Sequence, residues 1–143
     1  MKRFSFSLEK VESLKEFKKK QAELELGKAV QEEAKIQNSL DAIALAKVNA
    51  VKSANEAQDI SSLYSVQHYF SLLEQQKEIA IEDLTRAKVV TDEKRAEMEK
   101  CMREVKAIEN FKSLKKAEWK KQILQEEENT IDEIVTSKYN ISD

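Results

Sequence analysis

The sequence predicts an all-α protein in which two long helices form an antiparallel coiled-coil hairpin and the second helix overhangs the first. The chain of 143 residues has one glycine and no proline, so few residues interrupt a helix. Charged residues make up 36% of it. Apolar residues recur in two stretches at alternating steps of four and three, the spacing at which a helix buries one stripe against another helix. We expect residues 1–143 to form a single domain.

The first helix is predicted to run from about residue 7 to residue 58. Its stripe, nine of eleven positions apolar, consists of Ala22, Leu26, Ala29, Glu33, Ile36, Leu40, Ile43, Lys47, Ala50, Ala54 and Ala57. Apolar residues that precede it, Leu8, Val11, Leu14, Phe17 and Leu24, do not share this spacing. The stripe should therefore shift near residues 24–26. Gly27 follows at once, either as a tolerated helical glycine or as the site of a bend.

The turn is predicted at about residues 59–66, because aspartate and serine there compete for the helical hydrogen bonds. The second helix is predicted from about residue 67 to residue 139. Eight of its eleven stripe positions are apolar, and the stripe consists of Leu73, Lys77, Ala80, Leu84, Ala87, Thr91, Lys94, Met98, Cys101, Val105 and Ile108. Each stripe can be buried only by the other.

Two registers fit this hairpin. If the numbers of facing residues sum to 127, large residues meet small ones and Glu33 lies level with Lys94, which compensates two charged stripe positions. If they sum to 120, Lys94 lies level with Leu26, and Lys47 with Leu73. We favour the first register, in which about twenty residues of the second helix extend beyond the first.

The open end of the hairpin is expected to carry a basic collar and an acidic tip. Residues 1–20 hold seven basic and three acidic side chains, and residues 112–121 hold five basic and one acidic. Beyond residue 121 there are six acidic side chains and one lysine. Local charge should matter more for binding than the net charge of −2.

The sequence offers no candidate catalytic, cofactor-binding or metal-binding residue. His68 is the only histidine and Cys101 the only cysteine, which disfavours a zinc site and an internal disulfide. No glycine-rich phosphate loop is present, and the acidic run after Gln125 lacks the glycine of a calcium loop. Acidic neighbours of Trp119 argue against nucleic acid. Without candidate catalytic residues we expect a non-enzymatic protein. The single cysteine and the lack of an apolar run of roughly 18 residues predict a cytoplasmic location with no membrane insertion.

The start of the chain, Arg3-Phe4-Ser5-Phe6-Ser7-Leu8-Glu9-Lys10-Val11 followed by Leu14-Lys15-Glu16, resembles the opening of the FliJ family of flagellar type III export components. Chain length, the run Tyr69-Phe70-Ser71-Leu72-Leu73-Glu74 and the lysine-rich then acidic finish are also similar. The resemblance implies a stalk-like coupling and escort protein for flagellar protein export. Its implied partners are the hexameric export ATPase, the cytoplasmic domain of the export gate and export chaperones, at the cytoplasmic face of the inner membrane.

The resemblance also implies which residues bind these partners. For the export gate they are Tyr69, Phe70, Leu73, Gln76 and Ala80, although Leu73 and Ala80 can equally be core residues of the stripe. Gln76 and Ala80 differ from the small and histidine residues of some members. For the ATPase, we expect the open end to supply Phe4, Phe6, Leu8, Val11, Lys115, Lys116, Trp119, Lys120, Ile131, Ile134 and Val135.

Two other functions remain open. The first is a structural or tethering coiled coil that self-associates, for which the early apolar residues of the first helix would form the contact face. The second is a prefoldin-like holdase chaperone, which would need exposed apolar residues at the helix tips. Native mass spectrometry and an aggregation-suppression assay distinguish these functions from a stalk.

Overall fold

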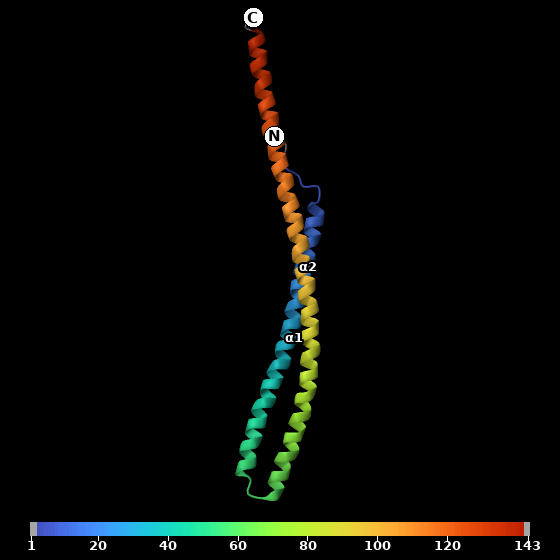
Figure 1. The fold of residues 1–143 in the computed structure, drawn as a ribbon, viewed down its shortest axis with the longest axis vertical. Coiled ribbons are helices and arrows are strands. Elements are labelled where there is room, and N and C mark those ends of the chain that lie inside the picture. The colour runs from blue at the N-terminus through green and yellow to red at the C-terminus, as the bar shows by residue number, and fades with distance from the viewer. Residues whose placement is uncertain (1–2, 142–143) are drawn as a thin grey trace. The chain divides into compact units, whose positions relative to one another are not determined.

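The computed structural model describes residues 3–141, which form two helices and no strand. Helix α1 spans Glu9–Glu56 and has 48 residues, and helix α2 spans Ile60–Ile141 and has 82 (Figure 1). The predicted all-α hairpin of two long helices is confirmed. The chain divides into two compact units, which we describe one at a time. That residues 1–143 form a single domain stays a prediction.

The turn unit comprises Lys20–Glu99 and contains the connection between the helices. This connection is shorter than the predicted turn at 59–66, because α2 already begins at Ile60. Asp59 caps the new helix: its carboxylate accepts a 2.7 Å hydrogen bond from the backbone N–H of Ser62. Hydrogen bonding by Ser62 lowers the pKa of Asp59. The aspartate and serines that suggested a loop therefore form a helix cap and the first turn of α2.

Burial confirms the predicted stripes in both helices. Every stripe position named above, from Ala22 to Ala57 and from Leu73 to Ile108, is buried or half-buried. The most buried of them is Thr91, which is 1% exposed and donates its hydroxyl to the carbonyl of Ala87. Because this bond satisfies the hydroxyl locally, a polar residue can occupy the core between the helices.

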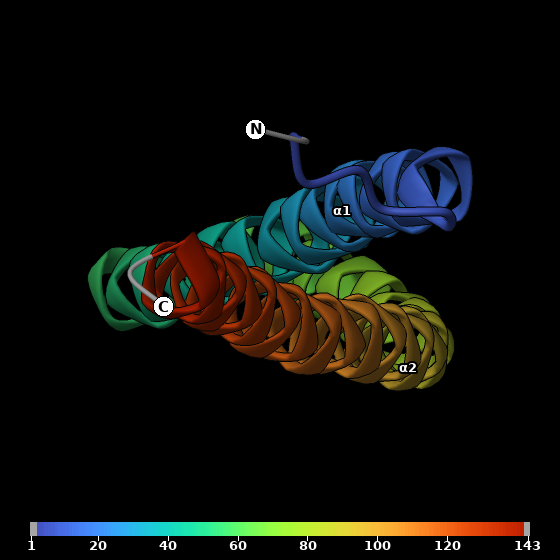
Figure 2. The ribbon, with the colours of Figure 1, turned by 90° about the horizontal axis from the view of Figure 1, so that it is seen from above.

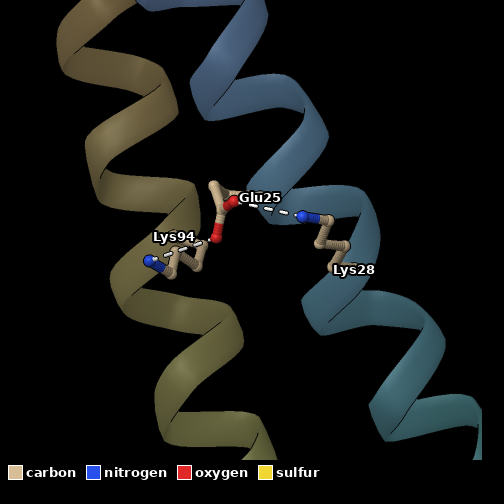
Figure 3. A network of polar contacts seen from close by, with 3 residues as sticks. All are labelled: Glu25, Lys28 and Lys94. Carbon is tan, nitrogen blue, oxygen red and sulfur yellow. Dashed lines mark hydrogen bonds and ion pairs between the residues drawn. The ribbon is translucent and has the colours of Figure 1, made fainter.

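The predicted register is wrong by one heptad. In the turn unit, Lys94 forms an ion pair with Glu25 (Figure 3). Lys47 forms another with Glu74. The numbers of the paired residues sum to 119 and 121. The prediction paired charged residues that lie level in the stripe. Lysine side chains are long enough to leave the stripe and meet glutamates at its edge, so Lys94 needs no facing Glu33.

Glu25 also forms an ion pair of 3.5 Å with Lys28, one helical turn along α1 (Figure 3). Its carboxylate thus links the two helices at 3.8 Å to Lys94. The side chains of Lys28, Glu25 and Lys94 are 74%, 50% and 40% exposed, so solvent screens the network and it contributes little stability. Its value is as a marker of the register.

The open-end unit comprises Met1–Lys19 and Lys100–Asp143. Here α1 begins at Glu9, two residues later than predicted. The expected shift of the stripe does not occur: Leu8, Glu12, Lys15 and Lys19 are half-buried and keep the spacing that leads to Ala22. The apolar residues of this segment lie outside the stripe, and Val11, Leu14 and Phe17 are 38%, 50% and 56% exposed. Two of the charged residues in the stripe, Glu12 and Lys15, form ion pairs with Lys112 and Glu104 of α2.

Candidate functional site

Residues 3–8 precede α1 as an irregular segment, which we call the N-terminal strap (Figure 2). Its two phenylalanines pack on aromatic residues of α2. The rings of Phe6 and Phe111 are 6.0 Å apart and those of Phe4 and Trp119 are 5.7 Å apart, both tilted. Phe6 is only 8% exposed, and Phe4 and Trp119 are half-buried. Tilted aromatic pairs at this separation are favourable, so the strap is held along one face of α2.

Two ion pairs join α1 to α2 below the strap. Lys112 Nζ lies 3.1 Å from Glu12 Oε1, and Lys15 Nζ lies 3.0 Å from Glu104 Oε2. The hydrogen bond from Lys15 is the main reason that the pKa of Glu104 is lower than usual. Side chains of Glu12 and Lys15 are 16% and 27% exposed, so these pairs are better shielded than the exposed pairs within single helices.

The predicted basic collar is only partly available to a partner. Lys112 and Lys15 are engaged in the pairs above, and Lys115 lies 3.4 Å from Glu118 and 5.5 Å from the ring of Phe111. On the α2 side of the collar, residues 112–121, the lysines that remain are Lys116, Lys120 and Lys121. They are exposed, and no ion pair involves them among residues 3–141.

Beyond Ile123, α2 continues as a single exposed helix, which we call the overhang. Every residue from Leu124 to Asn140 is exposed. The predicted apolar residues Ile131, Ile134 and Val135 lie in it, with 59%, 53% and 58% of their surface exposed. The structure therefore places the residues predicted to bind the ATPase in the open-end unit, but it buries Phe6 and half-buries Phe4, Leu8 and Trp119.

A groove of about 470 Å³ lies against the overhang next to the strap. It is lined by Trp119, Gln122, Ile123, Glu126, Glu127, Thr130 and Ile131. Of this set, only Trp119 and Ile131 were predicted to take part in binding. Ile123 was missed because the favoured register placed the start of α1 beside it, and Glu126 and Glu127 because they were interpreted as a solvated acidic tip.

The residues predicted to bind the export gate do not form one surface. Leu73 is 4% exposed and Ala80 is half-buried in the stripe, so both are core residues. Tyr69 is 47% exposed and Gln76 is exposed, one heptad apart on α2. Phe70 is half-buried beneath Lys47, whose Nζ is 5.4 Å from the ring centroid.

Tyr69 and Phe70 line two different grooves near the turn. The first, about 340 Å³, is lined by Ala46, Asn49, Ala50, Ser53, Ser65, Val66 and Tyr69. The second, about 420 Å³, is lined by Ala50, Val51, Ala54, Asn55, Leu63, Val66, Gln67 and Phe70. Leu72 lies three residues after Tyr69 on α2 and is 44% exposed, although the sequence did not indicate it as a binding residue.

The region around the turn is also poor in charge. Of residues 48–73, only Lys52, Glu56 and Asp59 carry a charged side chain, although 36% of the whole chain is charged. Apolar side chains are exposed there, among them Ile60 at 74% and Tyr64 at 73%. An exposed apolar surface with few charges is typical of a protein-binding site.

The part of the chain described by the structure holds no grouping of three or more histidine, cysteine, aspartate or glutamate side chains suited to a metal ion. None of its helices combines the length and the apolar character needed to cross a membrane. Cys101 lies in the stripe, 5% exposed. The candidate binding surfaces are the strap and overhang in the open-end unit, and the grooves and Tyr69 in the turn unit.

These features define a coiled-coil hairpin protein with exposed surfaces along two long helices. The chain belongs to the FliJ family, described as the flagellar FliJ protein, which it matches over residues 4–142. It is thus a component related to flagellar protein export, from a family of non-catalytic proteins of the export apparatus. No curated protein and no solved structure matches the chain.

Proposed function

We propose that this protein acts as a stalk-like coupling and escort component of flagellar export, without enzymatic activity of its own. In this proposal its open end is seated in the hexameric export ATPase, and residues near the turn contact the cytoplasmic domain of the export gate. Escort of export chaperones completes the role. The protein would work in the cytoplasm, peripherally at the inner membrane.

The overhang is the observation that carries the proposal. From Leu124 to Asn140 a single helix is exposed on every side. A single helix is only about 10–12 Å across with its side chains, narrow enough to enter the axis of a ring. Exposed Lys116, Lys120 and Lys121 precede it and suit carboxylates at the mouth of such a ring.

Truncation after Leu124 tests this role. We expect the truncated protein to keep its paired helices, because no residue beyond Leu124 is buried in the part of the chain that is described. It should lose its stimulation of the export ATPase. A matched control replaces Tyr64, 73% exposed and in the turn unit, with alanine and should retain stimulation. Full stimulation by the truncated protein would contradict the inserted-overhang role.

Charge reversal at Lys116, Lys120 and Lys121 tests docking separately. It should slow association with the ATPase and flatten its dependence on salt while leaving helicity unchanged, since long-range attraction between exposed charges speeds encounter. Association that stays equally fast and equally sensitive to salt would remove these lysines from the docking surface. Lys115 is left out because it pairs with Glu118.

Tyr69→Ala tests the contact with the gate. Tyr69 lines a groove and is 47% exposed, so its loss should weaken gate binding by about tenfold without unfolding the hairpin. Tyr139→Ala is the matched control: Tyr139 is 75% exposed and belongs to the open-end unit, so its loss should change gate binding little. Equal effects of the two substitutions would remove the assignment of Tyr69.

Self-association is the alternative that a specific observation favours. Val11, Leu14 and Phe17 form an exposed apolar face on α1 that no stripe residue of α2 covers. Native mass spectrometry should show a monomer if the protein is a stalk. A dimer lost on Phe17→Ser would instead support a tethering coiled coil. Suppression of aggregation of an unfolded client would favour the holdase alternative.

A further inference from the structure

The groove beside the overhang begins at Trp119, the residue on which Phe4 of the strap packs. Trp119 both packs on Phe4 and lines the groove, so the two features share one residue. The other lining residues follow along the same side of α2 at steps of three and four, as far as Ile131. All lining residues that the structure describes belong to α2. The groove therefore continues the face of α2 on which the strap is docked.

The stripe positions of this face disfavour a third helix as its occupant. Beyond Trp119, the spacing of the stripe leads to Gln122 or Ile123, then to Glu126 and Thr130. A facing helix would bury these polar side chains in a seam that requires apolar ones. The apolar residues that line the groove are Trp119 and Ile123 at one end and Ile131 at the other.

The strap shows which kind of chain this face accepts. It is not helical, and its phenylalanines at alternate positions, Phe4 and Phe6, reach Trp119 and Phe111. Arg3 precedes the first of them. An extended segment with an aromatic residue at every second position can place its rings on one helix while its backbone stays accessible to water.

The acidic lining of the groove favours an occupant that carries basic side chains. Glu126 and Glu127 line it, and Glu128, Asp132 and Glu133 follow on the same helix. Among residues 3–141, no lysine lines the groove. A segment that carries arginine or lysine between its aromatic residues would meet complementary charge here, whereas an acidic segment would be repelled.

We propose that this groove binds an extended segment of a partner protein in which aromatic and basic residues alternate, docked in continuation of the strap. Aromatic side chains contact Trp119, Ile123 and Ile131, and basic side chains pair with Glu126 and Glu127. The proposal does not depend on the stalk role, because it concerns the isolated protein and a peptide.

A blocked peptide of two Arg-Phe-Ser-Phe repeats tests the proposal on the full-length chain. Trp119 is the only tryptophan, so its fluorescence reports directly on the groove. Titration with the peptide should give a saturable change in fluorescence, and the affinity should fall as salt is added. A control peptide with alanine in place of phenylalanine should bind at least about tenfold more weakly, since stacking carries much of the energy. Equal binding of both peptides would overturn the aromatic part of the proposal.

The charge requirement is tested with Glu126→Gln combined with Glu127→Gln. We expect affinity to fall by about fivefold, in keeping with the loss of exposed ion pairs. Glu128→Gln combined with Asp132→Asn removes the same charge outside the groove lining and should change affinity by less than about twofold. Equal losses in the two variants would show non-specific attraction to an acidic helix and would overturn the proposal. So would a concentration-dependent dimer that disappears on Glu126→Gln with Glu127→Gln, since the occupant would then be a second copy of the chain.

Discussion

In the turn unit the stripe of α1 is mostly aliphatic or alanine, whereas in the open-end unit the same stripe continues through Glu12, Lys15 and Lys19. Burial of apolar surface holds the first unit together. The second depends on ion pairs from α2, on Val105 and Cys101, and on the aromatic contacts of the strap. The spacing of a stripe can thus persist along a helix while the chemistry that fills it changes completely.

The largest expected effect is on disulfide cross-linking in the turn unit, because a pair of introduced cysteines is either level across the helices or a heptad apart. Cysteines at Ala29 and Thr91, in a Cys101→Ser background, should form a disulfide rapidly, since residue numbers summing to about 120 place them level. Cysteines at Ala29 and Met98, level in the other register, should not. Gel mobility under non-reducing conditions distinguishes the two, and the reverse result would overturn the observed register.

Replacing a leucine with alanine should lower the free energy of unfolding much more in the turn unit than in the overhang. Leu73 is 4% exposed and Leu124 is 61% exposed. Leu73→Ala should lower the free energy of unfolding by about 2–4 kcal/mol because it leaves a cavity in the stripe. Leu124→Ala should change it by less than about 0.5 kcal/mol. Urea denaturation followed by circular dichroism measures both, and similar values for the two would contradict the assigned core.

Phenylalanine truncation tests the strap. Phe6 is 8% exposed and packs on Phe111, whereas Phe17 is 56% exposed. Phe6→Ala should weaken docking of the strap by about 1 kcal/mol, so that Trp119 becomes more accessible to acrylamide quenching. Phe17→Ala should leave quenching unchanged. The strap assignment fails if quenching responds to neither substitution.

Gly27→Ala should stabilise the turn unit by about 0.5–1 kcal/mol, because alanine has the higher helix propensity. No atom lies within 4 Å of a methyl group added there, and the glycine has no positive φ, so nothing opposes the substitution. Thermal unfolding would show a small rise in midpoint. A fall would indicate that α1 requires a bend at this position.

The smallest expected effect is the change in stability at acid pH. The folded-state pKa of Glu104 is lowered from 4.5, so its contribution to stability is present above pH 4.5 and is lost as the pH falls through the lowered value. Glu104→Gln should therefore reduce the loss of stability below pH 4.5. Glu109→Gln, at an exposed position of the same unit, serves as control. Identical acid profiles for the wild type and Glu104→Gln would contradict this linkage.

The stripes could be predicted because helix periodicity alone determines which residues face a partner, and all the predicted positions from Ala22 to Ala57 are at least half-buried. The register could not, because it depends on where flexible side chains such as Lys47 and Lys94 find carboxylates. The start of the stripe was missed for a related reason. Leu14 and Phe17 are apolar but exposed, and Glu12 and Lys15 are charged but covered by α2.

The candidate surfaces were predicted less completely. Their location in the two units follows from sequence patterns, because the overhang carries both charge and apolar residues without a partner helix. The pairing of Phe4 and Phe6 with α2 could not be foreseen, since an irregular segment has no periodicity from which to infer contacts. Burial of Leu73 was one of two interpretations that the sequence left open.

The short connection at Asp59 should determine the order in which the helices pair during folding. Lys47 and Glu74, near the connection, are separated by 27 residues of chain, whereas Glu12 and Lys112 are separated by 100. Closing the longer loop from an unfolded chain costs about 1 kcal/mol more entropy, so contacts near Asp59 should form first. The pairs at Glu12 and the strap then form by zippering, and they are the first contacts that a partner or a rise in temperature would release.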